Sequence, residues 1–234
     1  PEAIAEQAVA LAFALNRQIL RAGRHVQQHD FRNDDLVGFN FCNKTVGIIG
    51  LGHTGKAAAR IFNGIGTNVI GFDLNPAAAG EGLKLVSFDN LLAESDIISL
   101  HLPLTPDSRN LINKEAIRKM KNGVMLINTS RGDIIETKDI LEALQKEKIG
   151  YFGLDLFENE SDIVFGDLLS QLMEYPNVLI TPHQAYLTKE ALQEISNTTI
   201  KNLDLWQLNK CVGDACICAK DCRKNQFVST PNDK

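Results

Sequence analysis

Short apolar runs alternate with amphipathic stretches along most of this 234-residue chain. The runs are rich in Val, Ile and Leu, which is typical of strands buried on both faces of a sheet, and they cover residues 46–49, 68–72, 83–86, 96–102, 123–128, 151–157 and 177–181. Apolar residues at helical spacing lie between them, in residues 56–65, 88–94, 114–120, 137–149 and 167–174. This alternation predicts right-handed βαβ units and an α/β fold with a doubly wound parallel sheet. Ligands of such sheets gather at the carboxyl ends of the strands.

The two ends of the chain have different patterns. Residues 1–20 predict a helix that is apolar on more than one face, so we expect it to be buried between domains or subunits. Residues 21–44 are polar and are predicted to form a loop, and residues 189–208 predict a last helix with Thr188 as its N-cap. The first residue is Pro and leads directly into a helix, so we expect the chain to begin inside a longer protein.

A glycine motif follows the run at 46–49. Gly50, Gly52 and Gly55 form G-x-G-x-x-G, which follows a strand, opens a helix and precedes a second strand ending in Asp73. The first glycine allows a tight turn, the second lets a pyrophosphate approach the backbone, and the third lets the helix pack closely. Three glycines in the loops of an ordinary α/β protein are the alternative. The context favours dinucleotide binding. Asp73, an acidic residue at the tip of the second strand, favours NAD over NADP, because a carboxylate there can bind the ribose hydroxyls and would repel a 2′-phosphate.

Composition narrows the function classes. The chain is 44% hydrophobic and 23% charged with a net charge of −5, and it has no basic stripe, so nucleic-acid binding is not expected. No apolar run approaches the roughly 20 residues that span a membrane, and no signal peptide is visible. Four cysteines, Cys211, Cys216, Cys218 and Cys222, crowd into the tail, but their spacing does not match standard zinc-binding pairs, so no metal is predicted. The single cysteine in the body, Cys42, is consistent with a reducing cytoplasm.

Several polar residues near predicted strand ends are of the kinds that assist hydride transfer to a 2-keto acid. Such a reaction needs a cation for the substrate carboxylate and a proton donor at the carbonyl oxygen. Arg131 is suited to the first task because its planar guanidinium pairs with a carboxylate through two bonds. His183 is suited to the second because histidine is the side chain that ordinarily gains and loses a proton near neutral pH. Glu160 or Glu158 could orient the histidine and raise its pKa. Each assignment has an alternative. Arg131 could form a surface ion pair, His183 could be a histidine of an ordinary turn, and the two glutamates could be solvated loop charges.

Five ordered segments carry a resemblance to a known family. They are VGIIGLGHTGK, SDIISLHLPLTPDSRNLI, MKNGVMLINTSRGDII, FGLDLFENE and PNVLITPHQAYLT. Together they resemble the cofactor-binding region of the D-2-hydroxyacid dehydrogenase family, and the match runs from about residue 1 to 206. Within that family, HQAYLTKEAL and PEAIAEQAVAL look most like members that act on lactate.

The resemblance implies a function and a set of site residues. The implied reaction is the NAD-dependent interconversion of a 2-keto acid and a D-2-hydroxy acid, with pyruvate and D-lactate expected. Arg131 would bind the substrate carboxylate, and His183, paired with Glu160, would act as acid and base. The implied cofactor-binding residues are Gly50, Gly52, His53, Thr54, Gly55, Asp73, Pro103, Thr129 and Asp155, the last near the nicotinamide. Two alternatives stay open. The substrate could be a branched-chain keto acid, phosphoglycerate or glyoxylate, or the protein could be a non-catalytic NAD-sensing interaction protein.

The domain organisation is also predicted from this resemblance. We expect an interdomain and dimer helix with a linker at 1–40, an NAD-binding Rossmann domain at 41–187, and a C-terminal helix at 188–209 that packs toward a substrate domain missing from this chain. Residues 210–234 would form a polar, Cys-rich tail. A homodimer through the N-terminal helix region, a cytoplasmic location and little activity of this chain alone are further expectations.

Overall fold

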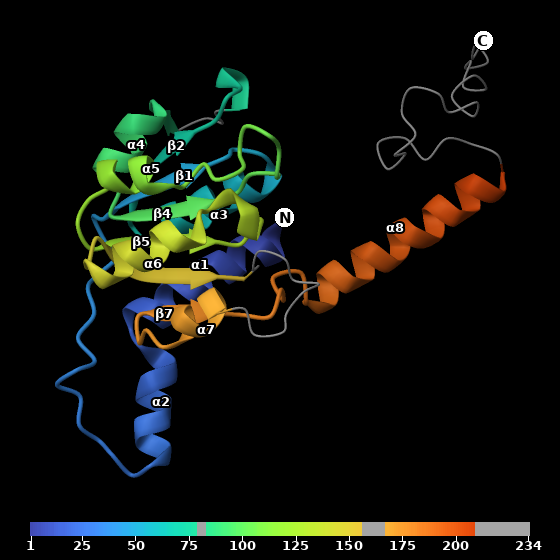
Figure 1. Ribbon diagram of the computed structural model, residues 1–234. Coiled ribbons are helices and arrows are strands. Elements are labelled where there is room, and N and C mark those ends of the chain that lie inside the picture. The colour runs from blue at the N-terminus through green and yellow to red at the C-terminus, as the bar shows by residue number, and fades with distance from the viewer. Residues whose placement is uncertain (79–82, 156–166, 209–234) are drawn as a thin grey trace. The chain divides into compact units, whose positions relative to one another are not determined.

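Seven parallel strands form one sheet in the computed structural model, which describes residues 1–78, 83–155 and 167–208. The strand order is β3-β2-β1-β4-β5-β6-β7, so the chain runs outward from β1 in both directions (Figure 1). This confirms the predicted doubly wound sheet. The strands are β1 (Thr45–Ile49), β2 (Asn68–Phe72), β3 (Lys84–Leu85), β4 (Ile97–Leu100), β5 (Val124–Asn128), β6 (Ile149–Leu154) and β7 (Val178–Ile180).

Helices cover both faces of this sheet. One apolar cluster joins α4, α5 and α6 to strand residues such as Leu100 and Leu126, and the other joins α1 and α3 to Ile48 and Ile127. Burial on both faces is the reason that the strands lack a polar alternation. The helices are α1 (Glu2–Asn16), α2 (Ile19–Gln27), α3 (His53–Gly64), α4 (Phe88–Glu94), α5 (Lys114–Lys119), α6 (Thr137–Gln145), α7 (Asp167–Met173) and α8 (Lys189–Gln207), with short 3₁₀ turns at Pro76–Ala78 and Gly132–Ile134.

The N-terminal region differs from the prediction of one helix over 1–20 followed by a loop. The first helix ends at Asn16, Gln18 takes a left-handed conformation with φ of 47°, and residues 19–27 form the separate helix α2. Asn16 is buried, and its side-chain amide bonds both backbone groups of Phe39, at 2.7 and 2.8 Å. The helix therefore ends where a distant segment docks, which no local pattern indicates.

The compact unit that contains the sheet comprises Pro1–Ala185. Helix α1 belongs to its core, because Ala5, Ala8 and Leu11 are buried in the same cluster as α3. The second unit begins at Tyr186, and its helix α8 starts at the predicted cap, where the Thr188 hydroxyl accepts a hydrogen bond from the Ala191 amide at 3.1 Å. The boundaries predicted at 40, 187 and 209 stay predictions. Across the described parts of both units, no helix is long and apolar enough to cross a bilayer.

Candidate functional site

A row of residues crosses the carboxyl edge of the sheet. Each of five strands contributes one residue to it, at the position after its last paired residue. The register of β1, β4, β5, β6 and β7 brings together Gly50, His101, Thr129, Asp155 and Thr181. Because side chains alternate along a strand, these residues share the face that α1 and α3 cover. Residues far apart in sequence thus meet at the edge where ligands of doubly wound sheets bind.

The glycine loop lies at one end of this row. Gly50 has a φ of 90°, and a Cβ there would lie 2.4 Å from the carbonyl oxygen of His101. A Cβ on Gly55 would lie 1.9 Å from the carbonyl oxygen of Gly50, so both glycines are required by the protein's own packing. Gly52 is different, because a Cβ there would meet no protein atom within 4 Å. Its φ of −66° also suits any residue, so the packing leaves space there that a pyrophosphate fits.

The start of α3 and the end of β2 complete a site that fits NAD. His53 and Thr54 form the first turn of α3, whose Gly52 N-cap has no side-chain cap, so their amides can bind an anion. At the tip of β2, the Asp73 carboxylate accepts hydrogen bonds from the amides of Leu51, at 2.7 Å, and Asn75, at 2.8 Å. Asp73 therefore lies against the glycine loop and helps to fix it. Its contact with ribose stays a prediction.

Arg131 lies in a turn that its neighbours hold in place after β5. Asn128 Nδ2 donates to the Arg131 carbonyl at 2.8 Å, and the Ser130 amide donates to Asn128 Oδ1 at 2.9 Å. The Ser130 hydroxyl also donates to the Leu100 carbonyl of β4, at 2.6 Å. The Arg131 side chain is exposed, and its Nη1 donates to the Ser130 carbonyl at 2.7 Å. The guanidinium thus lies at the carboxyl edge on a fixed backbone and is accessible to a carboxylate ligand.

Asp155 holds the turn that carries His183. Asp155 is fully buried, and its carboxylate accepts hydrogen bonds from the Gln184 amide at 3.1 Å, the Ala185 amide at 2.8 Å and the Thr181 hydroxyl. The His183 amide donates to the Asp155 carbonyl at 2.8 Å and to the Thr181 carbonyl at 3.0 Å. His183 itself takes a left-handed conformation with φ of 52°, and its side chain is exposed. The role of Asp155 at the nicotinamide stays a prediction, whereas its role in this turn is visible.

His101 belongs to this row, and the sequence interpretation did not name it as a candidate. Its ring is buried, Nε2 lies 2.9 Å from the Ser99 hydroxyl, and burial lowers the pKa of the imidazole to about 4. Among the described residues, His101 Nδ1 and the neighbouring Thr129 Oγ1 are buried without a hydrogen-bond partner. Thr129 and Pro103 were predicted for the cofactor site, and Pro103 is exposed and lies three positions past the end of β4. The signal for His101 was a histidine inside the largely apolar run 96–102.

Some predicted residues lie outside the described part of the chain. Glu158 and Glu160 fall within 156–166, and the four tail cysteines fall within 209–234. Within residues 1–78, 83–155 and 167–208, no group of three or more His, Cys, Asp or Glu residues could hold a metal ion. The predicted pairing of Glu160 with His183 therefore stays a prediction.

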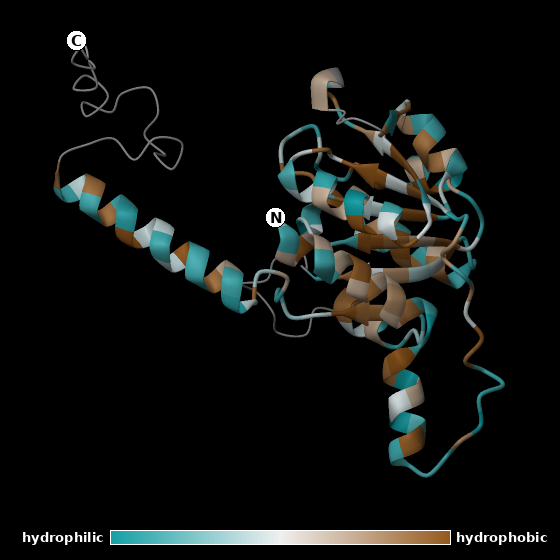
Figure 2. Cartoon of the chain, turned by 180° about the vertical axis from the view of Figure 1, so that it is seen from behind, coloured by the Kyte–Doolittle hydropathy of each residue, from teal (hydrophilic) through white to brown (hydrophobic). Residues whose placement is uncertain are grey.

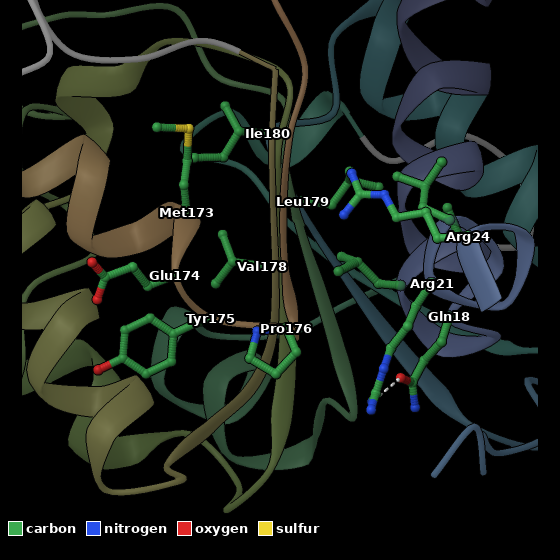
Figure 3. Close-up of a pocket in the computed structure, with 13 residues that line it drawn as sticks. Gln18, Arg21, Arg24, Met173, Glu174, Tyr175, Pro176, Val178, Leu179 and Ile180 are labelled. Carbon is green, nitrogen blue, oxygen red and sulfur yellow. Dashed lines mark hydrogen bonds between the residues drawn. The ribbon is translucent and has the colours of Figure 1, made fainter. Parts of the chain in front are cut away.

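A cavity lies away from the row, and none of the predicted site residues lines it. It has a volume of about 500 Å³ and lies between α1 and α2 on one side and β7 with the end of α7 on the other (Figure 3). Val178, Leu179 and Ile180 of the edge strand form one wall, and Arg21 and Arg24 of α2 lie opposite. This cavity is formed by the arrangement of α2 and does not belong to the candidate site.

The sheet order, the glycine loop and the open space at Gly52 define a doubly wound dinucleotide-binding domain. Residues 9–185 match the family model described as D-isomer specific 2-hydroxyacid dehydrogenase, NAD binding domain. The chain belongs to this family, and its cofactor is NAD.

Similar proteins give the extent of the match. The D-lactate dehydrogenase of Escherichia coli K12 is 44% identical over 214 residues, which are 87% of this chain and 65% of that protein. The structure of the pyruvate reductase of Chlamydomonas reinhardtii has a TM-score of 0.87 at 45% identity and covers 92% of this chain and 68% of that one. A D-lactate dehydrogenase with NAD⁺ from Lactobacillus jensenii has a TM-score of 0.81 at 37% identity, covering 91% and 68%. The chain spans about 65% of the length of its first curated relative.

Proposed function

We propose that the complete protein is an NAD-dependent dehydrogenase that interconverts a 2-keto acid and a D-2-hydroxy acid. The observation that carries this proposal is the shared carboxyl edge of the sheet, where the glycine loop, Arg131 and the turn of His183 all lie. A dinucleotide site next to a carboxylate-binding cation and a titratable imidazole is the set of groups that such a reaction needs. Membership of the family supports the same activity.

Each side chain has one task in this proposal. NADH, when bound, supplies the hydride. Arg131 binds the carboxylate of the keto acid through two parallel hydrogen bonds, which fixes the carbonyl in one orientation. Protonated His183 donates a hydrogen bond to the carbonyl oxygen and then transfers its proton there, and it takes the proton back in the oxidative direction. Glu160 orients the His183 ring, as the family resemblance implies.

Pyruvate is the substrate that the relatives favour. The relative from E. coli K12 is a D-lactate dehydrogenase at 44% identity, whereas a D-2-hydroxyisocaproate dehydrogenase structure shares 30% identity. The test is NADH oxidation by the complete natural polypeptide with pyruvate, a branched-chain keto acid, glyoxylate and phosphohydroxypyruvate, with the handedness of the product determined. Rapid D-lactate formation is the expected result, and L-lactate or no reaction with the whole panel would contradict the proposal.

The acid and base role of His183 is tested by His183→Gln. We expect turnover to fall by about 10²–10⁴, because this range is typical of lost general acid catalysis. The affinity for NADH, measured by fluorescence titration, should stay unchanged because the glycine loop lies at another strand. Gln184→Ala is the matched control, since Gln184 contributes its backbone amide to the turn. Near-normal turnover of His183→Gln would exclude the assignment.

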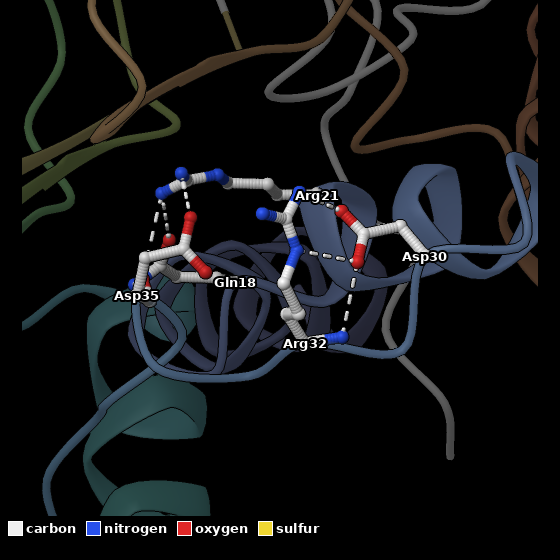
Figure 4. A network of polar contacts seen from close by, with 5 residues as sticks. All are labelled: Gln18, Arg21, Asp30, Arg32 and Asp35. Carbon is white, nitrogen blue, oxygen red and sulfur yellow. Dashed lines mark hydrogen bonds and ion pairs between the residues drawn. The ribbon is translucent and has the colours of Figure 1, made fainter.

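We also propose a homodimer through the region of α2 and residues 28–40. Five large apolar side chains of this region are more than half exposed (51–75%), and exposed apolar patches mark interaction surfaces. Figure 2 shows hydrophobic positions among hydrophilic ones along α2. Two ion pairs lie within this region, Arg21 with Asp35 and Arg32 with Asp30 (Figure 4). The exposed apolar residues are Ile19, Leu20, Val26, Phe31 and Val37.

Light scattering during gel filtration tests the dimer. The double variant Phe31→Ser and Val37→Ser should be monomeric at concentrations where the unchanged protein is a dimer. Lys84→Ser, at an exposed position of β3, is the control and should remain dimeric. A dimer that survives the double variant would place the interface elsewhere. The cytoplasmic location stays a prediction.

A further inference from the structure

We propose that Gln7 of helix α1 is a positioning residue for His183 and acts through Thr181 and Asp155. The inference rests on the acid and base role proposed for His183, and it adds a residue from the opposite end of the chain. Gln7 Nε2 donates a hydrogen bond to Thr181 Oγ1 at 3.2 Å, and Thr181 in turn donates to the Asp155 carboxylate. These contacts form a continuous path from α1 to the turn of His183.

The Asp155 carboxylate is the centre of this path. Oδ1 accepts from the Thr181 hydroxyl and the Gln184 amide, and Oδ2 accepts from the Ala185 amide. Together these bonds fix the backbone before and after His183. The left-handed conformation of His183, which is unusual for a residue with a Cβ, needs such support from its surroundings. Where the imidazole lies thus depends on the orientation of the Asp155 carboxylate.

Thr181 has one hydroxyl proton, which gives the path a direction. An ionised carboxylate only accepts hydrogen bonds, so the Thr181 hydroxyl must donate to Asp155. The Thr181 oxygen keeps free lone pairs and accepts from the Gln7 amide group, which is a donor at Nε2. Donation by Gln7 therefore orients the hydroxyl so that its proton points at the carboxylate. A side chain without an N–H at position 7 loses this effect even when its shape is the same.

Helix α1 is a rigid base for this contact. Ala5, Ala8 and Leu11 flank Gln7 in sequence and are buried against α3 and the sheet, so the backbone at Gln7 has little freedom. Gln7 is half-buried and lies on the face of the sheet that carries Asp155 and Thr181. The contact joins positions 174 residues apart and connects the first helix to the residue that follows the last strand of the sheet. We infer that α1 helps to set the position of the acid and base group.

The test compares variants that remove the donor with variants that keep the chemistry. Gln7→Met has a similar length and no N–H, Thr181→Val has the shape of threonine and no hydroxyl, and Thr181→Ser keeps the hydroxyl. Gln145→Met, at an exposed position of α6, controls for the exchange of glutamine for methionine. The measurements on the complete natural polypeptide are kcat, KM and NADH affinity. Amide hydrogen exchange of the segment 181–187 is followed in the same variants.

The expected result is a loss of kcat of about tenfold in Gln7→Met and in Thr181→Val, which is typical of one lost hydrogen bond. NADH affinity should stay within twofold, amide exchange at Gln184 and Ala185 should become about tenfold faster, and Thr181→Ser and Gln145→Met should match the unchanged protein. The double variant of Gln7→Met and Thr181→Val should lose about tenfold and not hundredfold, because both changes interrupt one path.

Two results would overturn the inference in distinguishable ways. If His183→Gln abolishes turnover while Gln7→Met keeps its kcat and its slow amide exchange, the proposed function stands and the role of Gln7 is refuted. A hundredfold loss in the double variant would likewise show that the two residues act independently. Normal turnover of His183→Gln would instead refute the acid and base role proposed for His183, and the positioning role of Gln7 would be lost with it.

Discussion

Asp155→Asn removes the charge and half of the accepting capacity of one buried side chain. The carboxylate of Asp155 is fully buried and accepts three hydrogen bonds, two of them from backbone amides. An asparagine side chain of the same shape has one oxygen and one NH₂ group. If its oxygen replaces Oδ1, its NH₂ group must face the Ala185 amide, which is also a donor.

The cost can be worked from these contacts. A buried donor left without a partner costs about 1–3 kcal/mol, and the bonds that remain are no longer charge-assisted, which removes up to about 1 kcal/mol more. The neutral amide no longer carries the desolvation cost of a buried carboxylate, and this offsets part of the loss. We therefore expect the free energy of unfolding to fall by about 2 kcal/mol.

Urea denaturation of the variant, followed by circular dichroism, measures this change. The matched control is Asp133→Asn, whose carboxylate pairs with the exposed Arg109 at 2.6 Å and has a side chain that is 26% exposed. An exposed ion pair contributes less than about 1 kcal/mol, so the control should lie close to the unchanged protein. If Asp155→Asn loses less than the control, the carboxylate does not hold the turn and the interpretation of Asp155 is wrong.

Two further predictions concern the cofactor end of the row. Asp73→Ala should weaken NADH binding and narrow the preference for NADH over NADPH, because it removes the acceptor for the Leu51 amide as well as the expected ribose partner; fluorescence titration with both cofactors measures this, and an unchanged ratio would exclude the ribose role. The pKa of His101 is lowered from 6.5 to about 4 in the folded chain, so the unfolded state binds more protons between these values. The contribution of neutral His101 to the free energy of unfolding is complete above pH 6.5. It is lost as the pH falls toward 4, by up to about 3 kcal/mol. Urea denaturation across this pH range should show that His101→Gln loses less unfolding free energy on acidification than the unchanged protein does. Equal losses in the two proteins would refute the lowered pKa of His101.

Local patterns were sufficient to predict most of the fold. The β2 strand was predicted with its observed bounds, Asn68–Phe72. A short apolar run between two helices is typical of a strand that is buried on both faces of a parallel sheet. The N-cap of α8 was also predicted, and the Thr188 hydroxyl accepts a hydrogen bond from the Ala191 amide at 3.1 Å. Capping depends on a side chain and an amide two or three residues away, so the sequence contains all of it.

The glycine loop was predicted for a similar reason, but the structure separates the roles of its members. The spacing of the three glycines and Asp73 indicated a dinucleotide site without any coordinates. Only the packing shows that Gly50 and Gly55 are required by neighbouring backbone, whereas Gly52 is left open for a ligand. The link from Asp73 to the Leu51 amide likewise depends on how β2 lies beside the loop.

By itself, the sequence determined the order of the elements, the parallel sheet and the dinucleotide motif, because these depend on periodicity and on contacts between near neighbours. The break between α1 and α2, the buried His101 and the path from Gln7 through Thr181 to Asp155 were decided only by the tertiary structure. Each depends on residues that are distant in sequence and adjacent in space, such as Asn16 with Phe39 or Gln7 with Thr181. The strand register brings them together, and register is a property of the assembled sheet.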